Sequence, residues 1–314
     1  MPLLVLNKFD VGLGTCWYGT AGGVVRIPVV YSQLMVADSG HSVSPSASKP
    51  AMVAQALKQH DYPVDFFEPI PVTPEDFMRV HEPRFVQAVL EGREDNGFGN
   101  RSADVARSLP YTSGSLLTAA KLALKPSMHA VVASLSSGFH HAHYAKAEDF
   151  CTFNGLMVVA ANLISSGAVN RLAIVDGDYH YGNGTDEILD RTGLNANVFH
   201  LSFGKDLKRP EQASQYFDRL HQLEEELRRF QPSLILYQAG ADAHIDDPLG
   251  GMLTTEEMGL RDETLFAIGK RLGIGVVFNL AGGYQRDADG GFQKVVRLHL
   301  NTFSAALRVF GPST

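Results

Sequence analysis

The chain has 314 residues, with 34 acidic side chains against 27 basic ones and a formal net charge of −7. This acidic balance argues against a basic surface for binding nucleic acid. Hydrophobic residues make up 45% and charged residues 19% of the chain, which excludes disordered and fibrous proteins and leaves enough apolar side chains for a sizeable core. The length permits two domains, but a single α/β domain with one large sheet often has this length as well.

Cysteine use and hydropathy bear on the compartment. The two cysteines, Cys16 and Cys151, are too few for a disulfide-stabilised fold and fit a reducing compartment. The apolar N-terminal segment lacks the basic leader of a signal peptide, and no uncharged apolar run reaches the ~18 to 20 residues that a membrane span requires. We therefore expect a cytoplasmic protein with no membrane partner.

Five apolar runs rich in β-branched residues predict buried strands, and two helical patterns lie among them. The strands are expected at 128–135, 171–176, 197–201, 233–239 and 274–280, and the helices at 155–165 and 211–230. The second helical pattern places Phe217, Leu220, Leu223 and Leu227 along one side. Because strands and helices alternate, we expect an α/β fold with an open, mostly parallel sheet covered by helices.

Polar segments follow four of the five strand-like runs, at 136–141, 176–180, 239–242 and 281–284. An open parallel sheet binds its ligand beyond the carboxyl ends of its strands, where these loops meet. Most residues with catalytic or metal-binding chemistry therefore come from the edge of the sheet where a ligand is expected.

Two of these segments suggest a metal site. Asp178 and His180 stand two residues apart, so in extended backbone they point the same way, about 6.6 Å apart along the strand. Asp242 supplies a third candidate ligand from another strand end. Three protein ligands leave one zinc position for water or substrate, as in catalytic zinc sites. A polar strand terminus is the alternative for each segment alone, but a histidine pair and a Gly-Gly-Tyr segment at equivalent strand ends favour the metal site.

Six segments resemble, in order, the successive signatures of the histone deacetylase superfamily, which includes bacterial deacetylase-like proteins and acetylpolyamine amidohydrolases. They are Ser-Gly-Phe-His-His-Ala at 137–142, Asp-Phe-Cys-Thr-Phe-Asn at 149–154, Val-Asp-Gly-Asp-Tyr-His-Tyr-Gly-Asn-Gly-Thr at 175–185, Gly-Ala-Asp at 240–242, Asp-Pro-Leu-Gly at 247–250 and Gly-Gly-Tyr at 282–284. The resemblance implies an arginase-like catalytic domain over 28–314, with a central, mostly parallel sheet of about eight strands. Residues 1–27 match nothing recognisable and could cover the site entrance, help a dimer form, or do neither.

The resemblance also implies roles for the polar residues. Asp178, His180 and Asp242 would bind zinc; His140 and His141 would be the catalytic histidine pair; Tyr284 would face the substrate carbonyl; Asp176 would orient His140; and Asn183 would stand behind His141. In this scheme zinc activates a water molecule, and His141 takes the proton and later delivers it to the leaving amine. Zinc and the Tyr284 hydroxyl stabilise the oxyanion. For an isolated histidine pair, mutual packing at a strand end is the alternative.

Further implied features are a substrate tunnel and a second cation. Gly138, Phe139 and Phe150 would line the tunnel for an acylated lysine, although both aromatic residues alone also fit a core or rim position. A structural potassium ion would lie near Asp176, held by that side chain, the main-chain oxygens of Asp178 and His180, and Ser202 with Phe203. Ferrous iron is the alternative to zinc, because a carboxylate and imidazole ligand set accepts either metal.

The expected function is a zinc-dependent hydrolysis that removes an acetyl or other acyl group from a lysine side chain. An acetylpolyamine amidohydrolase and a long-chain lysine deacylase stay open, because the histidine segment departs from the Pro-Gly-His-His form of many family members and the negative net charge also suits a polyamine. An arginase-type enzyme with two manganese ions would need carboxylates in place of Gly182 and Gly240. A non-catalytic protein that binds acylated ligands or acts as a scaffold is the alternative from another class. The sequence leaves the oligomeric state open.

Overall fold

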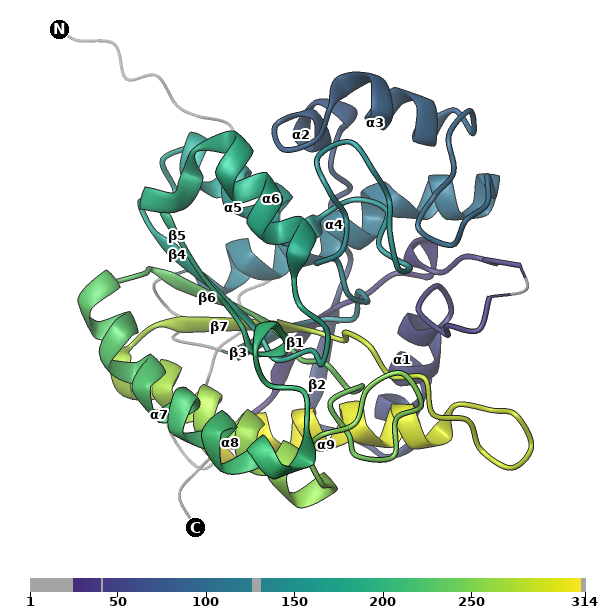
Figure 1. Cartoon of the computed structure of the whole chain (residues 1–314). Coiled ribbons are helices and arrows are strands. Elements are labelled where there is room, and N and C mark those ends of the chain that lie inside the picture. The colour runs from purple at the N-terminus through teal and green to yellow at the C-terminus, as the bar shows by residue number, and fades with distance from the viewer. Residues whose placement is uncertain (1–24, 41, 126–130, 312–314) are drawn as a thin grey trace, which may run out of the picture.

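The computed structural model describes residues 25–40, 42–125 and 131–311, and its described strands form one parallel sheet (Figure 1). In chain order the strands are β1 (Ile27–Val30), β2 (Val64–Phe67), β3 (Val131–Ser134), β4 (Leu172–Asp176), β5 (Val198–Ser202), β6 (Leu234–Gln238) and β7 (Gly275–Asn279). Their spatial order is β2-β1-β3-β7-β6-β4-β5, and every neighbouring pair is parallel. The expected parallel α/β fold is confirmed, with seven strands in the described residues against the eight or so expected.

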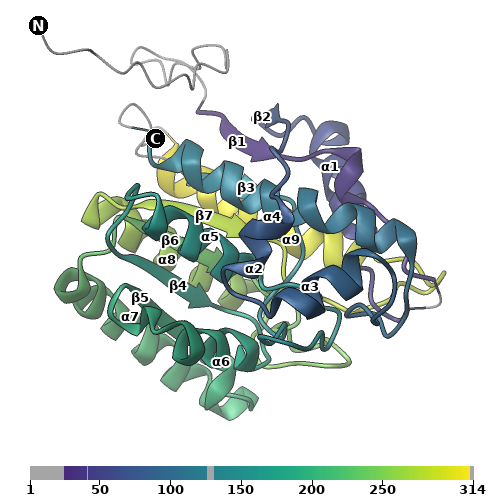
Figure 2. The ribbon, with the colours of Figure 1, turned by 90° about the horizontal axis from the view of Figure 1, so that it is seen from above.

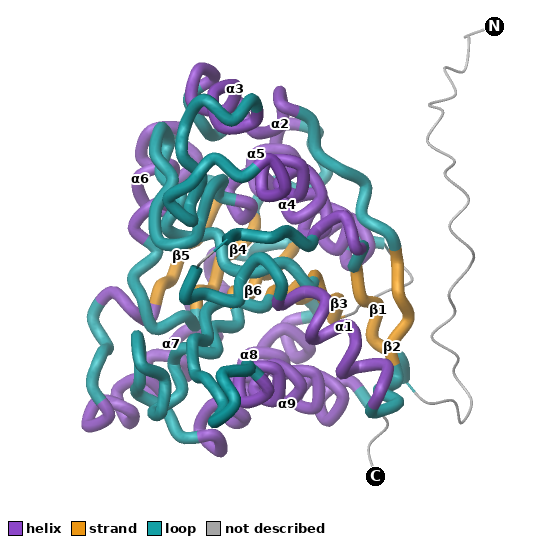
Figure 3. The backbone as a smooth tube through the Cα atoms, turned by 90° about the vertical axis from the view of Figure 1, so that its right-hand side faces the viewer, coloured by secondary structure: helices purple, strands orange, loops and turns teal. Residues whose placement is uncertain are grey.

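Helices cover both faces of the sheet (Figures 2 and 3). They are α1 (Lys49–Gln59), α2 (Pro74–Met78), α3 (Pro83–Leu90), α4 (Ala103–Ala123), α5 (Gly155–Ser165), α6 (Asn183–Thr192), α7 (Ala213–Phe230), α8 (Thr255–Leu272) and α9 (Gln293–Phe310). Helices α1, α7, α8 and α9 contribute to the hydrophobic cluster on one face, and α2 to α6 contribute to the cluster on the other. Among the described residues, no helix is both long enough and apolar enough to cross a membrane.

Alternation of side chains along the central strands divides the core into these two clusters. In β7, Val276 and Phe278 pack in the cluster of α8 and α9, whereas Val277 packs in the cluster of α4 and α5. Successive side chains of a strand point to opposite faces, so a strand between two helical layers must be apolar at nearly every position. This double burial explains why the central strands are recognisable in the sequence as continuous apolar runs.

Most predicted elements lie where the sequence places them. Strands β4, β6 and β7 begin one residue after the predicted starts and end within one residue of the predicted ends, and α5 has the predicted bounds. Helix α7 begins at Ala213, after a 3-10 turn at Pro210–Gln212. Within the run at 128–135, β3 begins at Val131, and residues 128–130 lie outside the described residues, as do 1–24 of the predicted extension.

Three strands differ from the sequence-based expectation. Burial of β5 on both faces is wrong: four of its five residues are partly exposed because it is an edge strand with β4 as its neighbour. Strands β1 and β2 were not predicted. Pro28 interrupts the apolar pattern of β1, and Asp65 interrupts that of β2, which forms the opposite edge of the sheet. Short edge strands carry a weak sequence signal, because one side of each needs no apolar partner.

The strand order brings the four polar segments together. Strands β3, β7, β6 and β4 are consecutive neighbours at the centre of the sheet, and each is followed by one of the predicted polar segments. Since all four strands are parallel, these segments meet at the same edge. The fold therefore assembles one candidate site from residues far apart in the chain.

A buried arginine holds two of these strand ends in place. Arg261 of α8 is 1% exposed and donates hydrogen bonds from one guanidinium nitrogen to the main-chain oxygens of Gly177, at 3.0 Å, and Gly240, at 2.9 Å. Its Nε donates to Asp262, which also accepts hydrogen bonds from the hydroxyls of Tyr237 and Thr302. Arg261 thus connects the segments that follow β4 and β6 to helix α8.

We expect Arg261→Met to lower the free energy of unfolding by about 3–5 kcal/mol, because it leaves the carboxylate of Asp262 buried without its cationic partner. Chemical denaturation followed by circular dichroism measures this loss. Arg308→Met is the matched control: its ion pair with Glu263 of the same helix is exposed and contributes at most about 1 kcal/mol. Equal losses in the two variants would contradict a bracing role for Arg261.

Candidate active site

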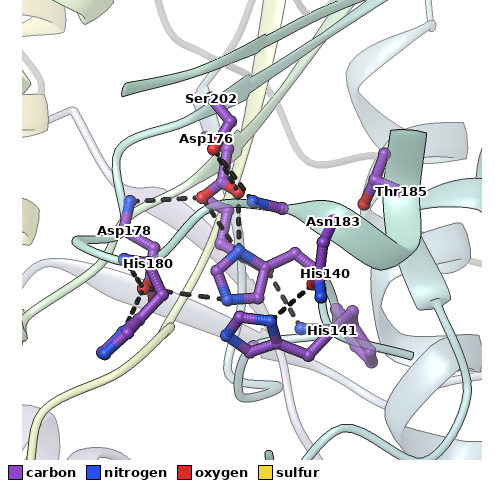
Figure 4. A network of polar contacts seen from close by, with 12 residues as sticks. His140, His141, Asp176, Asp178, His180, Asn183, Thr185 and Ser202 are labelled. Carbon is purple, nitrogen blue, oxygen red and sulfur yellow. Dashed lines mark hydrogen bonds and ion pairs between the residues drawn. The ribbon is translucent and has the colours of Figure 1, made fainter. Parts of the chain in front are cut away.

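Three side chains from two strand ends form a cluster with metal-ligand chemistry. Asp178 and His180 follow β4, Asp242 follows β6, and one candidate ligand atom from each lies within 4.8 Å of the others. The Nδ1 atom of His180 lies 2.8 Å from a carboxylate oxygen of Asp242 and 3.3 Å from one of Asp178 (Figure 4 shows the latter contact). Two carboxylates and an imidazole that converge at this distance fit a divalent metal ion.

Backbone hydrogen bonds orient the carboxylates of this cluster, and the carboxylates in turn determine the pKa of His180. The backbone N–H groups of His180 and Tyr179 donate to carboxylate oxygens of Asp178, at 2.9 Å, and Asp242, at 3.2 Å, which fixes the orientation of both carboxylates. Burial opposes a charge on His180, but the two carboxylates outweigh it and raise the pKa of His180 to about 11. A proton on His180 thus supplies part of the positive charge that a cation would supply at the same place.

Next to this cluster lies a pair of adjacent histidines in the loop after β3, with their rings tilted at 55° to each other. The rings of His140 and His141 have centroids 4.0 Å apart. Nδ1 of His140 lies 2.6 Å from a carboxylate oxygen of Asp176, whose other oxygen accepts a hydrogen bond from Gln238 at 3.0 Å. Nδ1 of His141 lies 2.8 Å from the amide oxygen of Asn183 (Figure 4).

Different partners give the two histidines different protonation states. Burial alone would lower the pKa of His140, but the carboxylates of Asp176, Asp178 and Asp242 outweigh it and raise this pKa to about 9. Burial and the neighbouring His140 lower the pKa of His141 to about 4. Near neutral pH the pair therefore combines a cationic imidazole with a neutral one, a division suited to electrostatic stabilisation by the first and proton acceptance by the second.

The Gly-Gly-Tyr segment after β7 turns sharply against the metal-ligand cluster. Gly282 and Gly283 have φ angles of +53° and +92°, and a Cβ on Gly282 would lie 2.4 Å from the carboxylate carbon of Asp242. Only glycine tolerates both this conformation and this approach. Burial, followed by the nearby carboxylates of Asp242 and Asp178, raises the pKa of Tyr284 well above its ordinary value, so its hydroxyl keeps a hydrogen to donate.

Two residues that the sequence analysis did not assign to the site hold this turn. Lys49, which is 0% exposed, donates from Nζ to the main-chain oxygen of Gly282 at 2.5 Å. Asp247 accepts the backbone N–H of Tyr284 at 2.8 Å. The residues around Lys49 form no pattern that distinguishes it from a surface lysine. Asp247 belongs to the Asp-Pro-Leu-Gly segment, which resembles a family motif, but the sequence analysis assigned no role to this residue.

The three predicted tunnel residues line a common cavity, but the two aromatic rings among them have different neighbours. The ring of Phe150 lies beside that of Tyr284, with centroids 5.6 Å apart, and beside that of Phe98, at 6.0 Å. Phe139 is 5% exposed, and its ring packs so closely on Gly155 that a Cβ there would lie 2.6 Å away. Gly138, Phe139 and Phe150 all line one cavity between the β3 loop and α4. Phe150 is thus the aromatic neighbour of Tyr284, and Phe139 belongs largely to the core.

Two of the predicted potassium ligands, Ser202 and Asp176, lie close together. The hydroxyl of Ser202 lies 3.5 Å from a carboxylate oxygen of Asp176 and accepts the backbone N–H of Gly182 at 3.0 Å. A Cβ on Gly204 would lie 2.5 Å from the main-chain oxygen of His180, so the segment after Phe203 runs directly against that oxygen.

Close packing excludes the carboxylates of the two-manganese alternative. A Cβ on Gly240 would lie 2.3 Å from the Cα of Asp178, and one on Gly182 would lie 2.8 Å from a carboxylate oxygen of Asp176. Neither position accepts a side chain without a shift of its neighbours. Within the part of the chain that the structure describes, the metal-ligand cluster has three members and no others.

Comparison with known proteins agrees with this geometry. The family model of the histone deacetylase domain matches residues 44–210 and 205–300. Histone deacetylase 2 of Arabidopsis thaliana is 28% identical over 56% of this chain and 49% of its own length, and a probable deacetylase of Methanothermobacter thermautotrophicus is 24% identical over 65% and 70%. The crystal structure of an acetylpolyamine aminohydrolase from Burkholderia pseudomallei shares the fold, with a TM-score of 0.69 at 18% identity over 89% of this chain and 98% of that one. The chain therefore belongs to the histone deacetylase family, as the resemblance of its motifs implied, and is a hydrolase of the deacetylase class.

Proposed function

We propose that this chain is a zinc-dependent amidohydrolase that removes an acetyl or other acyl group from the side-chain amine of an acylated lysine. The observation that carries the proposal is the convergence of Asp178, His180 and Asp242 beside the buried histidine pair. Membership in the histone deacetylase family supports the reaction class.

Asp178, His180 and Asp242 would hold the metal ion. Bound there, zinc would polarise the amide carbonyl and lower the pKa of an attacking water molecule. Both aspartates are at most 3% exposed, and low exposure strengthens electrostatic interactions within the site. His180 is partly exposed, which leaves an approach for substrate from solvent.

His141 would act as the general base and then as the general acid. Its Nδ1 is engaged by Asn183, so Nε2 is the nitrogen available to the reactants. With its pKa lowered, His141 is neutral near neutral pH and can accept a proton from the attacking water. The same proton can then pass to the leaving amine, which converts that amine into a better leaving group.

His140 and Tyr284 would stabilise the negative charge that develops on the carbonyl oxygen. The carboxylate of Asp176, 2.6 Å from Nδ1, favours a cationic His140 and fixes its ring orientation. The Tyr284 hydroxyl would donate a hydrogen bond to the oxyanion, and one such donor contributes about 2.7–4 kcal/mol of transition-state stabilisation. The rings of Phe150 and Phe98 would flank the methylenes of the lysine side chain.

We further propose a structural potassium ion beside Asp176, supported by the proximity of Ser202 and the segment after Phe203 to Asp176 and His180. Ferrous iron remains the alternative for the catalytic metal. We also infer a cytoplasmic location, which the small number of cysteines supports.

Removal of the metal should abolish turnover. We expect the zinc-loaded protein to carry one tightly bound ion per chain, measured by elemental mass spectrometry, and to hydrolyse a fluorogenic acetyl-lysine peptide. Asp178→Ala and His180→Ala should lose both the ion and the activity, whereas Asp190→Ala, an exposed carboxylate on α6, should keep both. Reconstitution with ferrous iron under anaerobic conditions compares the two metals. Turnover that survives chelation of divalent ions would refute the proposed mechanism.

Tyr284→Phe should lower kcat about 10²–10³-fold while the metal content stays unchanged, because it removes a hydrogen-bond donor to the oxyanion but no metal ligand. Steady-state kinetics with the acetyl-lysine peptide measures the effect. Tyr62→Phe is the control: its hydroxyl bonds to Ser304 and Leu300 of α9, and we expect kcat within twofold of the wild-type value. A Tyr284→Phe enzyme with full kcat would exclude the hydroxyl from catalysis.

A substrate panel separates the remaining candidates. We expect the acetyl-lysine peptide to give a higher kcat/KM than either an N-acetylated polyamine or a peptide with a long acyl chain on lysine. A preference for the polyamine or for the long-chain peptide would assign the corresponding alternative function. If the metal-loaded protein bound acylated ligands but hydrolysed none of them, the non-catalytic alternative would hold.

A further inference from the structure

A polar network lies behind Asn183, on the side away from His141. It consists of His143, Glu148 and Glu187, and we call it the outer network. Nε2 of His143 lies 2.9 Å from a carboxylate oxygen of Glu148, and Nδ1 of His143 contacts the carboxylate of Glu187. The amide nitrogen of Asn183 lies 3.4 Å from the same oxygen of Glu148 and 3.3 Å from Nε2 of His143.

These contacts determine which way the Asn183 amide points. Its oxygen accepts the backbone N–H of Gly184 at 3.0 Å and faces Nδ1 of His141 at 2.8 Å. A reversed amide would place its oxygen against the carboxylate of Glu148 and its NH₂ group against the N–H of Gly184. Both contacts would be repulsive, so the two ends of the amide group are fixed by neighbours of opposite hydrogen-bonding character.

A fixed amide oxygen fixes the hydrogen of His141. Because an amide oxygen only accepts hydrogen bonds, Nδ1 of His141 must carry the hydrogen. The lone pair of a neutral His141 is then on Nε2, the nitrogen that a general base needs on its reactive side. If the Asn183 amide were free to turn, its NH₂ group would favour the opposite tautomer, with Nε2 protonated and unable to accept.

The placement of Glu148 suits this task. Asn183 and Glu187 stand four residues apart on α6, on neighbouring positions of one helix face, and His143 and Glu148 come from the loop after β3. Glu148 also begins a tight turn, in which its main-chain oxygen accepts the N–H of Cys151 at 2.8 Å. The turn presents Phe150 with a φ of +66°. Glu148 thus contacts the Asn183 amide through its carboxylate and forms the turn that carries Phe150 through its main chain.

We propose that Glu148, supported by His143, is a positioning residue that keeps the amide of Asn183 oriented and thereby holds His141 as the Nδ1–H tautomer. The inference rests on the proposed function in that it assigns His141 as the base. The competing explanation is that Glu148 only forms a surface ion pair with Lys146, whose side chain is 64% exposed. Such a pair contributes little to stability and nothing to the tautomer of His141.

The tautomer can be observed without any turnover. Long-range ¹H–¹⁵N correlation spectra of the full chain with labelled histidine, with His141→Gln used to assign the signal, should show the wild-type ring protonated at Nδ1. In Glu148→Ala, we expect a mixture of tautomers or loss of the Nδ1–H form. Glu148→Gln should restore the wild-type pattern, because its amide oxygen can accept from Asn183. An unchanged His141 signal in Glu148→Ala would overturn the inference.

Kinetics supplies the second readout. Glu148→Ala should lower kcat about 10-fold with KM within about twofold, the size of effect seen when a partner that orients a functional histidine is lost. Glu148→Gln should recover most of the activity, and Lys146→Ala should match the wild type. Combined with Asn183→Ala, Glu148→Ala should cause no further loss, because both act through the same amide. Additive losses, or a rise in KM with kcat unchanged, would overturn the positioning role.

The two proposals fail in distinguishable ways. If the wild-type protein hydrolysed no acylated substrate, the proposed function would fail, while the spectra would still test the control of the tautomer. If the wild type were active and both the spectra and kcat of Glu148→Ala were unchanged, only the positioning role would fail. Thermal unfolding of each variant shows whether the fold is intact. Because Glu148 is partly exposed, we expect its substitution to change the unfolding temperature little.

Discussion

Three buried carboxylates at the carboxyl ends of β4 and β6 impose the main constraint on this structure. Asp176 and Asp242 are 0% exposed and Asp178 is 3% exposed. Isolated buried carboxylates would be prohibitively costly, so cationic or donor groups must surround them. His140, His180 and the backbone N–H groups of the loop after β4 serve this purpose. The arrangement of the site follows from this need to balance negative charge in a place that water hardly reaches.

Lys49 is understandable on the same basis. Burial lowers its pKa to about 8, although the carboxylates of Asp242, Asp178 and Asp247 oppose that decrease. A lysine this deep is retained in a fold only where surrounding negative charge compensates for its lost hydration. Its hydrogen bond to Gly282 also fixes the turn before Tyr284, so one side chain serves both the charge balance and the position of the Tyr284 hydroxyl.

The sequence predicted the site best where polar residues directly follow a strand that is recognisable from its apolar pattern. Strand β4 was predictable because both of its faces are buried, and the alternation of Asp176, Asp178 and His180 after it showed which side chains share a direction. The position of Asp242 after another predicted strand made it the third candidate ligand, and the family motifs then connected Tyr284 to the same place. The contributions of Lys49, Gln238 and Glu148 were not predictable, because each depends on one long-range hydrogen bond and the flanking residues reveal nothing of the partner. For Phe139 the motif suggested a tunnel wall; its ring lines a cavity together with Phe150 and also packs on Gly155.

The glycines at positions 182 and 240 restrict what this scaffold can become. A Cβ on Gly240 would lie against the backbone of Asp178, and one on Gly182 would lie against the carboxylate of Asp176 and the ring of His200. A side chain at either position would displace these neighbours, which at Gly240 include the candidate ligand Asp178, before it could add a carboxylate. A second metal ion held by carboxylates at positions 182 and 240 would therefore require a different backbone path in the connections after β4 and β6. Single substitutions within the present fold would not provide that site.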